Sequence, residues 1–559
     1  MECGRCGCDR HRILAGAPVL PAVPAQGAWA CIGVASPWGV STKLDTLLDP
    51  LEAQNQGQSG LATLLDNADA FAARALSAAQ AGRSLDLMYY IWRTDVTGWL
   101  LLDALMAAAD RGVRIRLLLD DVNVQGFDPA FLALTGHPMT EVRLFNPTRN
   151  RGHVVRRTFE MLLGLARFNR RLHGKLWIAD GRLAIIGGRN IGDTYFGALE
   201  GGSRNSVDAD MLLVGPMVDE VATLFDSYWN LGLALPILDL WPGFKMNRTK
   251  FCSRLACEVR TPPSRRYLAR TLNGRRAEAV LKRFGFHATH PPPISPRRRP
   301  GSRWLSSKHR GPGLRRGEIG RGGERFTSKA NRFDRAAALD RQSAAFGRPA
   351  GQGLWQSFRT VDVDSHRRHS DEGPDRGPAH YPLLRARSDR NCGIDRARAA
   401  RGVRVCLLTN ALSATDMLLV YGAYRRCRGA LLAAGAVIHE FSPMPKPDRQ
   451  RDVLHSKVFV IDGRQAIVGS LNFDLRSAFT NTELGLLFEH PALVAEIARM
   501  IDALSAPDQA YAVSRLHKAL QWTVARPGLP AVMFVEPEAS GPQRSISWIV
   551  GLLPIQSYL

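Results

Sequence analysis

The feature that most constrains this chain is a motif that occurs twice. Residues 172–190 read LHGKLWIADGRLAIIGGRN, and residues 454–472 read LHSKVFVIDGRQAIVGSLN. Both copies have His-x-Lys, four residues, Asp, six residues, Gly, two residues and Asn, and the histidines stand 282 positions apart (455 minus 173). Identical spacing of so many polar residues predicts two related lobes that use the motif together.

The repeat extends beyond the motif. RGVRIRLLLD at 111–120 matches RGVRVCLLTN at 401–410, and EVRLFNP at 141–147 matches VIHEFSP at 437–443. The three matched elements occur in the same order in both halves, with offsets of 290, 296 and 282 residues. This order indicates internal duplication rather than coincidence.

The local pattern within the halves is α/β. Residues 85–92 and 113–120 are predicted strands, and Gly98–Asp110 has its apolar residues on one helical face. Strand, helix and strand of these lengths predict a parallel pair with a right-handed crossover. After each motif lysine an apolar run predicts a strand, and Asp-Gly predicts the tight turn into the next one. The expected fold class is α/β, with two duplicated lobes around a pseudo-two-fold axis and an irregular basic insert between them.

The net charge of +23 belongs to the region between the halves. Residues 241–400 hold 36 basic and 13 acidic residues, so the remainder has 38 of each. Residues 241–393 are rich in Arg, Pro, Gly and Ser and almost lack periodic apolar stretches. Three interpretations stay open for this segment: a disordered basic linker, a translated frameshift, or a nucleic-acid-binding module. The basicity therefore says nothing about the lobes that carry the motif.

The frameshift interpretation follows from a gap in the repeat. The second half has no counterpart of the strand at 85–92, and that element is expected just before residue 394. There the chain reads LLRARSDRNCGI. A one-base shift allows the codons of Leu383–Ser388 to encode Tyr-Phe-Val-Pro-Gly, a strand followed by a turn.

Membrane contact is suggested by the N-terminal region and, more weakly, by the apolar run ISWIVGLLPI at 546–555, which is too short to span a bilayer. Residues 13–40 are uncharged and resemble a poor signal or anchor segment, although Pro18, Pro21 and Pro24 spoil it as a spanning helix. No other apolar run is long enough to cross a bilayer. The expected segments are an N-terminal extension at 1–59, a first lobe at 60–240, the irregular segment at 241–393, a second lobe at 394–520 and a C-terminal tail at 521–559.

The motif residues suit the chemistry of a phosphodiester. On a strand, His173 and Lys175 share one face because they lie two residues apart, and the second copy repeats this arrangement. Two ammonium groups and two amides suit the non-bridging phosphate oxygens, and two imidazoles suit a two-step displacement. Lysine supplies the positive charge, so no metal or other cofactor is expected. The residues are His173, Lys175, Asn190, His455, Lys457 and Asn472.

This pattern resembles the phospholipase D superfamily, whose motif is His-x-Lys-x4-Asp-x6-Gly-Ser-x-Asn. The resemblance covers residues 60–240 and 394–520. Stretches such as YYIWRTDVTG, RFNRRLHGK, IIGGRNIGDTYF, FDLRSAFTNTELG and GLLPIQSYL are similar to its bacterial cardiolipin synthase C branch. The resemblance implies two α/β/α sandwich lobes and a phosphatidyl transferase that acts on phospholipids through a phosphohistidine.

The resemblance also implies a role for each catalytic residue. His173 is the expected nucleophile, and His455 is the expected general acid and then the base for the acceptor alcohol. Asp180 and Asp462 complete the motif, but they lie too far along the strand to touch phosphorus and are expected to be structural. Lys175, Lys457, Asn190 and Asn472 would hold the phosphoryl oxygens.

Further positions around the motif are also assigned by resemblance. Glu483, in NTELG, is expected to orient a histidine, with Asp210 as its counterpart in the first half. The serine of the family motif is Gly188 in the first copy and Ser470 in the second, which removes one hydroxyl donor. These four residues are expected to support or line the site.

Three functions stay open. The chain is a cardiolipin synthase-like phosphatidyl transferase, a hydrolytic phospholipase or nuclease of the same fold, or the non-catalytic product of a frameshifted gene. The first implies phospholipid partners, namely phosphatidylglycerol with phosphatidylethanolamine as a further candidate, and a membrane surface in the bacterial cell envelope. Nucleic acid is not an expected partner.

Overall fold

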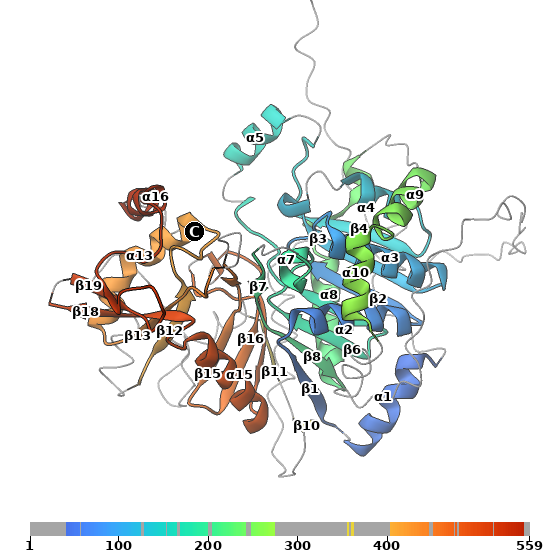
Figure 1. Cartoon of the computed structure of the whole chain (residues 1–559). Coiled ribbons are helices and arrows are strands. Elements are labelled where there is room, and N and C mark those ends of the chain that lie inside the picture. The colour runs from blue at the N-terminus through green and yellow to red at the C-terminus, as the bar shows by residue number, and fades with distance from the viewer. Residues whose placement is uncertain are drawn as a thin grey trace, which may run out of the picture.

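Figure 1 shows the computed structural model of the chain, in which two α/β lobes lie side by side. The structure describes residues 41–552 except for 56, 125–127, 152–153, 165–167, 200–203, 242–247, 274–354, 357–358, 363–402, 446–450, 475, 478–479 and 518. The candidate anchor at 13–40 and the suspected frameshift at Leu383–Ser388 lie outside the described residues. The α/β fold class predicted from the sequence is confirmed.

The first lobe is built on a nine-stranded sheet with the order β10-β1-β8-β6-β5-β2-β3-β4-β9. Its β2, β3 and β4 run parallel, whereas β5, β6, β8 and β1 are antiparallel to their neighbours. The parallel strands are buried on both faces, and their buried charged side chains are paired, as Arg116 donates to Asp86 at 2.6 Å. The strands are β1 (Ser59–Leu64), β2 (Ser84–Tyr89), β3 (Arg114–Asp120), β4 (Thr140–Phe145), β5 (Leu176–Ala179), β6 (Leu183–Gly187), β8 (Asp210–Val214), β9 (Ala234–Pro236) and β10 (Trp355–Gln356).

Several helices, among them α2 and α3, cover one face of this sheet, whereas α8 (Met217–Trp229) and the second lobe pack on the other. Trp177 and Ile185 belong to the core under α2 and α3, whereas Ile178 and Ile186 belong to a core shared with the second lobe. This alternation follows from the two-residue period of a strand. The helices of the first lobe are α1 (Lys43–Gln54), α2 (Asn67–Gln80), α3 (Val96–Asp110), α4 (Asp128–Leu134), α5 (Val154–Leu163), α7 (Asp193–Phe196), α8 (Met217–Trp229), α9 (Arg248–Glu258) and α10 (Pro262–Thr271), with 3-10 turns at Val122–Val124 and Ile237–Leu240.

The expected boundary of the first lobe at residue 240 is too early. The helices α9 and α10 belong to the segment that the sequence marked as irregular, yet both pack on the first lobe. Phe251, Leu255 and Tyr267 are buried in its core, and the Tyr267 hydroxyl donates to the Phe196 carbonyl at 2.8 Å. One or two buried apolar residues per helix are enough to attach it to the lobe, and a pattern of so few apolar residues among many arginines does not predict a helix.

The second lobe contains two separate sheets, with the orders β11-β17-β16-β15 and β12-β13-β18-β19-β20. The helix α15 packs on the first of these sheets, and α13 packs against α16. The elements are β11 (Arg359–Asp362), β12 (Cys406–Asn410), β13 (Val437–Phe441), β15 (Val458–Ile461), β16 (Gln465–Gly469), β17 (Leu484–Phe488), β18 (Ala510–Leu516), β19 (Ala519–Thr523), β20 (Val532–Met533), α13 (Leu418–Ala433), α15 (Pro491–Leu504) and α16 (Gly541–Leu552).

No strand among the described residues joins the two sheets of the second lobe. In the first lobe β2 pairs with β3 on one side and β5 on the other, and it makes the sheet continuous. The repeat equates β3 with β12 and β5 with β15, but no strand of the described chain joins these two. All residues of β5 are buried, whereas all residues of β15 are only half-buried, and Cys406 of β12 is exposed. The place where the repeat predicts a missing strand, just before residue 394, lies outside the described residues, so the gap stays a prediction.

Candidate active site

Each motif histidine lies on a segment that pairs with the other lobe. The short strand β14 (Val453–Leu454) runs parallel to β7 (Ser206–Val207), and the His455 amide donates to the Val207 carbonyl at 2.9 Å. The first copy repeats this arrangement, because Leu172 bridges Thr482 and the His173 amide donates to the Thr482 carbonyl at 3.0 Å. These crossed pairings bring the two copies of the motif together at the boundary between the lobes.

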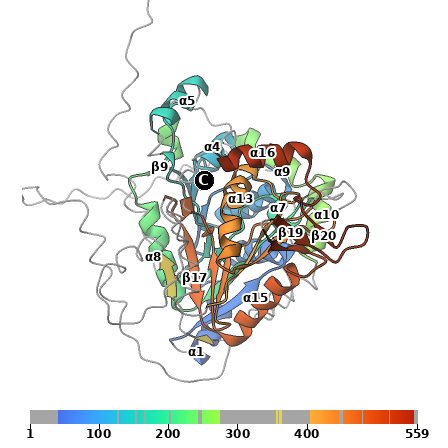
Figure 2. The same cartoon turned by 90° about the vertical axis from the view of Figure 1, so that its left-hand side faces the viewer.

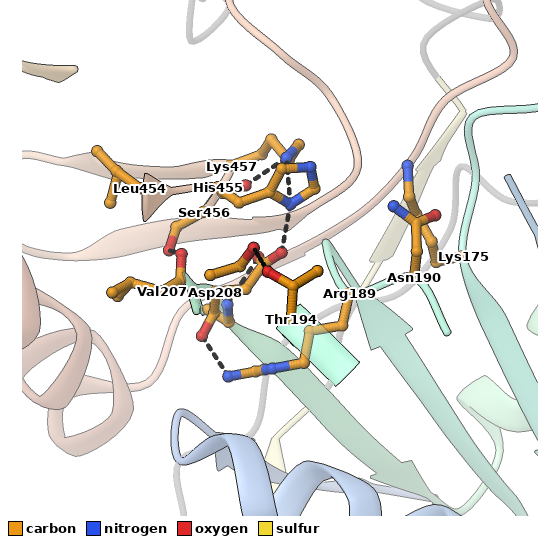
Figure 3. Close-up of polar contacts among 12 residues, drawn as sticks. Lys175, Arg189, Asn190, Thr194, Val207, Asp208, Leu454, His455, Ser456 and Lys457 are labelled. Carbon is orange, nitrogen blue, oxygen red and sulfur yellow. Dashed lines mark hydrogen bonds and ion pairs between the residues drawn. The ribbon is translucent and has the colours of Figure 1, made fainter. Parts of the chain in front are cut away.

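The crossed pairings place a carboxylate from the opposite lobe beside each histidine. Asp208 directly follows β7, and its Oδ2 lies 2.6 Å from Nδ1 of His455 (Figure 3). Glu483 directly follows Thr482, and its Oε2 lies 2.8 Å from Nδ1 of His173. Both carboxylates are buried, at 1% and 3% exposure. A carboxylate at Nδ1 holds that nitrogen as the donor and leaves Nε2 free to react.

The expectation that Asp210 is the counterpart of Glu483 is wrong by two residues. Gly187 pairs with Asp210 in the first lobe, and Gly469 pairs with Gly485 in the second, so the register equates Glu483 with Asp208. Side chains two residues apart point to the same face, which is why either aspartate fitted the pattern. Asp208 can be identified as the counterpart of Glu483 only from the strand register, and the sequence alone does not show that register.

Asp210 has a different role. It accepts from Arg74 at 2.8 Å and lies 3.4 Å from the Arg189 guanidinium, and all three side chains are buried. Arg189 also donates to the Asp208 carbonyl, as Figure 3 shows, and to the Leu64 carbonyl at 2.7 Å. This ion cluster fixes the backbone that carries both Asp208 and the motif asparagine.

The position of the motif serine explains a difference between the two carboxylates. The Ser470 hydroxyl donates to Glu483 at 2.6 Å. In the first copy, a Cβ atom at Gly188 would lie 2.2 Å from Oδ1 of Asp208, so a side chain has no room there. The shorter aspartate therefore sits against a glycine, and the longer glutamate sits against a serine that holds it.

The two lysines lie beside their histidines and are almost completely buried. The Lys457 ammonium is 2.9 Å from Nδ1 of His455, and Lys175 donates to the carbonyl of His173. In Figure 3, Lys175 and Asn190 lie next to one another on the first lobe, across from His455 and Lys457. The site thus has one cation from each lobe.

The asparagines end the second strand of each motif. Oδ1 of Asn190 accepts from the Ile91 amide at 3.2 Å, while its buried Nδ2 makes no hydrogen bond of normal geometry in the described part of the chain and lies near the Tyr195 hydroxyl. Asn472 occupies the equivalent place after β16 and is half-buried. A buried donor without a well-formed hydrogen bond costs free energy, so Nδ2 of Asn190 fits an acceptor such as a phosphoryl oxygen.

The motif aspartates lie at the other end of their strands, in the predicted Asp-Gly turns. Asp180 and Gly181 have φ of +54° and +66°, and Asp462 and Gly463 have +52° and +63°. The Asp180 carboxylate accepts from the backbone amides of Gly82, Arg83 and Ser84 at 2.7–3.1 Å, which fixes the entry into β2. Asp462 is exposed, and in the described structure its side chain makes no such contact.

Burial controls the protonation of the first copy. It lowers the pKa of His173 to about 4, against the opposing effect of Glu483 and with further lowering by Lys175 and Lys457. It also lowers the pKa of Lys175 to about 7, and the charge of Lys457 lowers it further. At neutral pH His173 is therefore a neutral base. Charged residues of the second lobe, Glu483 and Lys457, change the pKa values of both His173 and Lys175 in the first lobe.

In the second copy of the motif, the pKa of the histidine is also lowered, and the histidine is more exposed. Burial and Lys457 lower the pKa of His455, and Asp208 opposes them. The His455 side chain is 22% exposed, compared with 9% for His173. Aromatic rings cover both histidines edge-on, since Tyr90 is 4.9 Å from His173 and Tyr195 is 5.2 Å from His455, between ring centroids.

No group of His, Cys, Asp and Glu that suits a metal ion occurs among the described residues.

The fold and the paired motifs define a phospholipase D-like protein. The family model described as "Cardiolipin synthase, PLD-like domain" matches residues 73–229 and 394–505, and the chain belongs to this family. It is 32% identical over 532 residues to cardiolipin synthase C of Escherichia coli (strain K12), which covers 92% of this chain and 99% of that protein.

Two further comparisons are weaker. The major cardiolipin synthase of Bacillus subtilis (strain 168) is 30% identical over 167 residues, which is 30% of this chain and 32% of that one. The crystal structure of phosphatidylserine synthase from Haemophilus influenzae Rd KW20 aligns with a TM-score of 0.45 and 11% identity, over 83% of this chain and 91% of that chain.

Proposed function

We propose that this chain transfers phosphatidyl groups between phospholipids, as the name of its Escherichia coli relative indicates for that protein. The observation that carries the proposal is the crossed pair of histidine–carboxylate contacts, His173 with Glu483 and His455 with Asp208, beside two buried lysines. A donor such as phosphatidylglycerol supplies the phosphodiester, and a second phospholipid alcohol accepts the phosphatidyl group.

In the first step Nε2 of His173 attacks phosphorus, and the bond from phosphorus to the glycerol headgroup breaks. His455 gives its proton to the leaving oxygen, and Asp208 stabilises the imidazolium before that transfer. The product is a phosphatidyl group bound to His173 and a free glycerol. The negative phosphodiester raises the pKa of His455 on binding, which supplies the protonated form that this step needs.

In the second step His455 takes the proton of the acceptor hydroxyl, whose oxygen attacks phosphorus as the bond to His173 breaks. With phosphatidylglycerol as acceptor the product is cardiolipin, and both histidines return to their initial state. Lys175, Lys457, Asn190 and Asn472 hold the non-bridging oxygens during both steps. No cofactor is needed, because the lysines supply the charge that a metal would supply.

The product of phosphatidylglycerol turnover tests this proposal. We expect the purified chain to convert phosphatidylglycerol labelled in its acyl chains into labelled cardiolipin, with one glycerol released for each cardiolipin formed. Added phosphatidylethanolamine tests whether a second lipid raises the yield. The His173→Ala variant is the control. Phosphatidic acid as the only labelled product would mean that water is the acceptor, and the transferase proposal would fail.

We predict a bell-shaped pH dependence of kcat/KM. The acidic limb lies near pH 4, because His173 must lose its proton before it attacks. The alkaline limb reflects two losses: the proton that His455 must give, whose pKa burial lowers, and the charge of Lys175, whose pKa is about 7. In Lys175→Arg the guanidinium stays charged, so the alkaline loss that remains is expected to belong to His455, while the acidic limb stays. An unchanged alkaline limb in this variant would show that Lys175 does not contribute to it.

A further inference from the structure

Exposed apolar side chains gather on α5, which stands away from the body of the first lobe (Figure 1). Val155, Phe159, Leu162 and Leu163 are 58–87% exposed. They follow one another at helical spacing and form a single stripe along the helix. A contiguous exposed apolar stripe of this kind marks a surface that contacts another protein or a membrane.

The second lobe carries a similar surface on α16. Ile546, Trp548, Ile549 and Leu552 are 45–62% exposed, whereas Ser547 and Val550 on the opposite side are buried. Val550 meets α13 at Gly422, where a Cβ atom would lie 2.5 Å from its Cγ1. The helix is therefore fixed on α13 by one side and presents tryptophan and aliphatic side chains on the other.

Both helices are attached at the edge of the sheets where the site lies. In the first lobe β3 ends at Asp120, whose carboxylate accepts from the Leu172 amide beside His173, and its partner β4 leads into α5. In the second lobe β12 ends at Asn410, whose side chain bonds the Leu454 backbone beside His455. The segment after β12 leads into α13, on which α16 packs. Figures 1 and 2, two views at right angles, show α5 and α16 at the same end of the molecule.

The charge around α5 selects an anionic partner. Arg149 precedes the helix, Arg156 borders the apolar stripe and Arg170 follows it, and all three are exposed. Arginines at the edge of an apolar stripe extend their guanidinium groups to the headgroups of a bilayer while the stripe enters the acyl region. No helix in the described part of the chain is long and apolar enough to cross a membrane.

We propose that α5 and α16, one from each lobe, dock the protein on a single leaflet that contains anionic phospholipid. The docked pose brings the leaflet to the edge of the sheets that carries His173 and His455. This inference deepens the proposed function by naming the surface through which lipid substrate reaches the site. The partner is the bilayer itself, not a second protein.

Binding to vesicles by the full chain tests the proposal. The vesicles contain equal parts of phosphatidylglycerol and phosphatidylcholine, or phosphatidylcholine alone, and bound protein is measured by flotation. We expect Phe159→Asp with Leu163→Asp, and separately Trp548→Asp with Ile549→Asp, each to weaken binding by about tenfold or more. The control is Leu516→Asp, because Leu516 is exposed at the far end of β18 from the site and should bind like the unchanged chain.

Two further measurements separate docking from catalysis. The ratio of turnover on vesicles to turnover on dispersed short-chain phosphatidylglycerol is expected to fall in both double variants, whereas His173→Ala should bind vesicles normally. Loss of transferase activity in every chain, with docking still dependent on α5 and α16, would refute only the proposed function. Double variants that bind vesicles as tightly as Leu516→Asp would refute the docking surface. So would double variants that bind weakly only because they change the oligomeric state measured by light scattering.

Discussion

His455→Ala is expected to trap a phosphatidyl group on His173. Without the second imidazole the leaving glycerol and the acceptor alcohol lack their proton donor and base, which costs about 10²–10⁴-fold in each step. A reactive donor with a good leaving group, such as a p-nitrophenyl phosphatidyl ester, needs no proton for the first step. That step then outruns the second, and the covalent intermediate accumulates.

His173→Ala is expected to behave differently, with no adduct and a loss of turnover of about 10⁴–10⁶-fold, as for other deleted nucleophiles. The measurement is the intact mass of the protein after a brief reaction stopped in cold, mildly alkaline denaturant, where a phosphorus–nitrogen bond survives. The control is His517→Ala, because His517 is exposed on the turn after β18 and should leave both rate and adduct unchanged.

The position of the adduct decides between two assignments. An adduct on His455 in the His173→Ala chain would reverse the roles of the two residues. The environment favours His173 as nucleophile, because it is the more buried of the two and burial lowers its pKa to about 4. A neutral imidazole shielded from water attacks well, and the acceptor meets the more open His455. No adduct in any chain would argue for direct displacement without a covalent step.

The sequence predicted the elements of this site better than their pairing. The strands around the motif and the Asp-Gly turns follow from local patterns, and they occur where they were expected. The contacts between His173 and Glu483, 310 residues apart, and between His455 and Asp208, 247 residues apart, depend on how the lobes pack. A local sequence pattern does not predict such pairings. The prediction therefore named Asp210, two residues after the aspartate that contacts His455.

The same limit explains what was missed in the basic segment and on α5. In α9 and α10 a few apolar residues suffice because the first lobe offers a face to cover. The stripe on α5 has the spacing of a helix that packs in a core, yet it faces solvent. Periodicity predicts that a helix has an apolar side, but the tertiary structure determines whether protein or another phase covers it.

Supplying the predicted strand between β12 and β15 is expected to stabilise the second lobe. Compensating one-base changes that make the codons of Leu383–Ser388 encode Tyr-Phe-Val-Pro-Gly would supply it, with parallel pairing to β12 and antiparallel pairing to β15. Ladder hydrogen bonds on both sides, at about 1 kcal/mol each, amount to on the order of 5 kcal/mol. The strand would also place an aromatic residue near His455, as β2 leads into Tyr90 beside His173.

Hydrogen exchange of β12 and β15 measures the effect. In the chain as written these strands should exchange quickly, because their facing edges are unpaired in the described structure, and the restored chain should protect them as β3 and β5 are protected. The control is the restored chain with its valine replaced by proline, which cannot donate to the ladder. Slow exchange of both strands in the chain as written would show that their edges are already paired, and would refute the proposal.

Asp462 gives this prediction its most specific test. In the first lobe Asp180 accepts three backbone amides at the entry to β2, whereas Asp462, at the equivalent turn, is exposed. A restored strand would bring its own entry amides to Asp462. Asp462→Ala should therefore change stability by less than about 0.5 kcal/mol in the chain as written, but by about 1–3 kcal/mol in the restored chain, where it leaves buried amides unpaired. This coupling between a turn and a strand arises only if the strand occupies the predicted position, because an unrelated stabilisation of the lobe would leave the two changes additive.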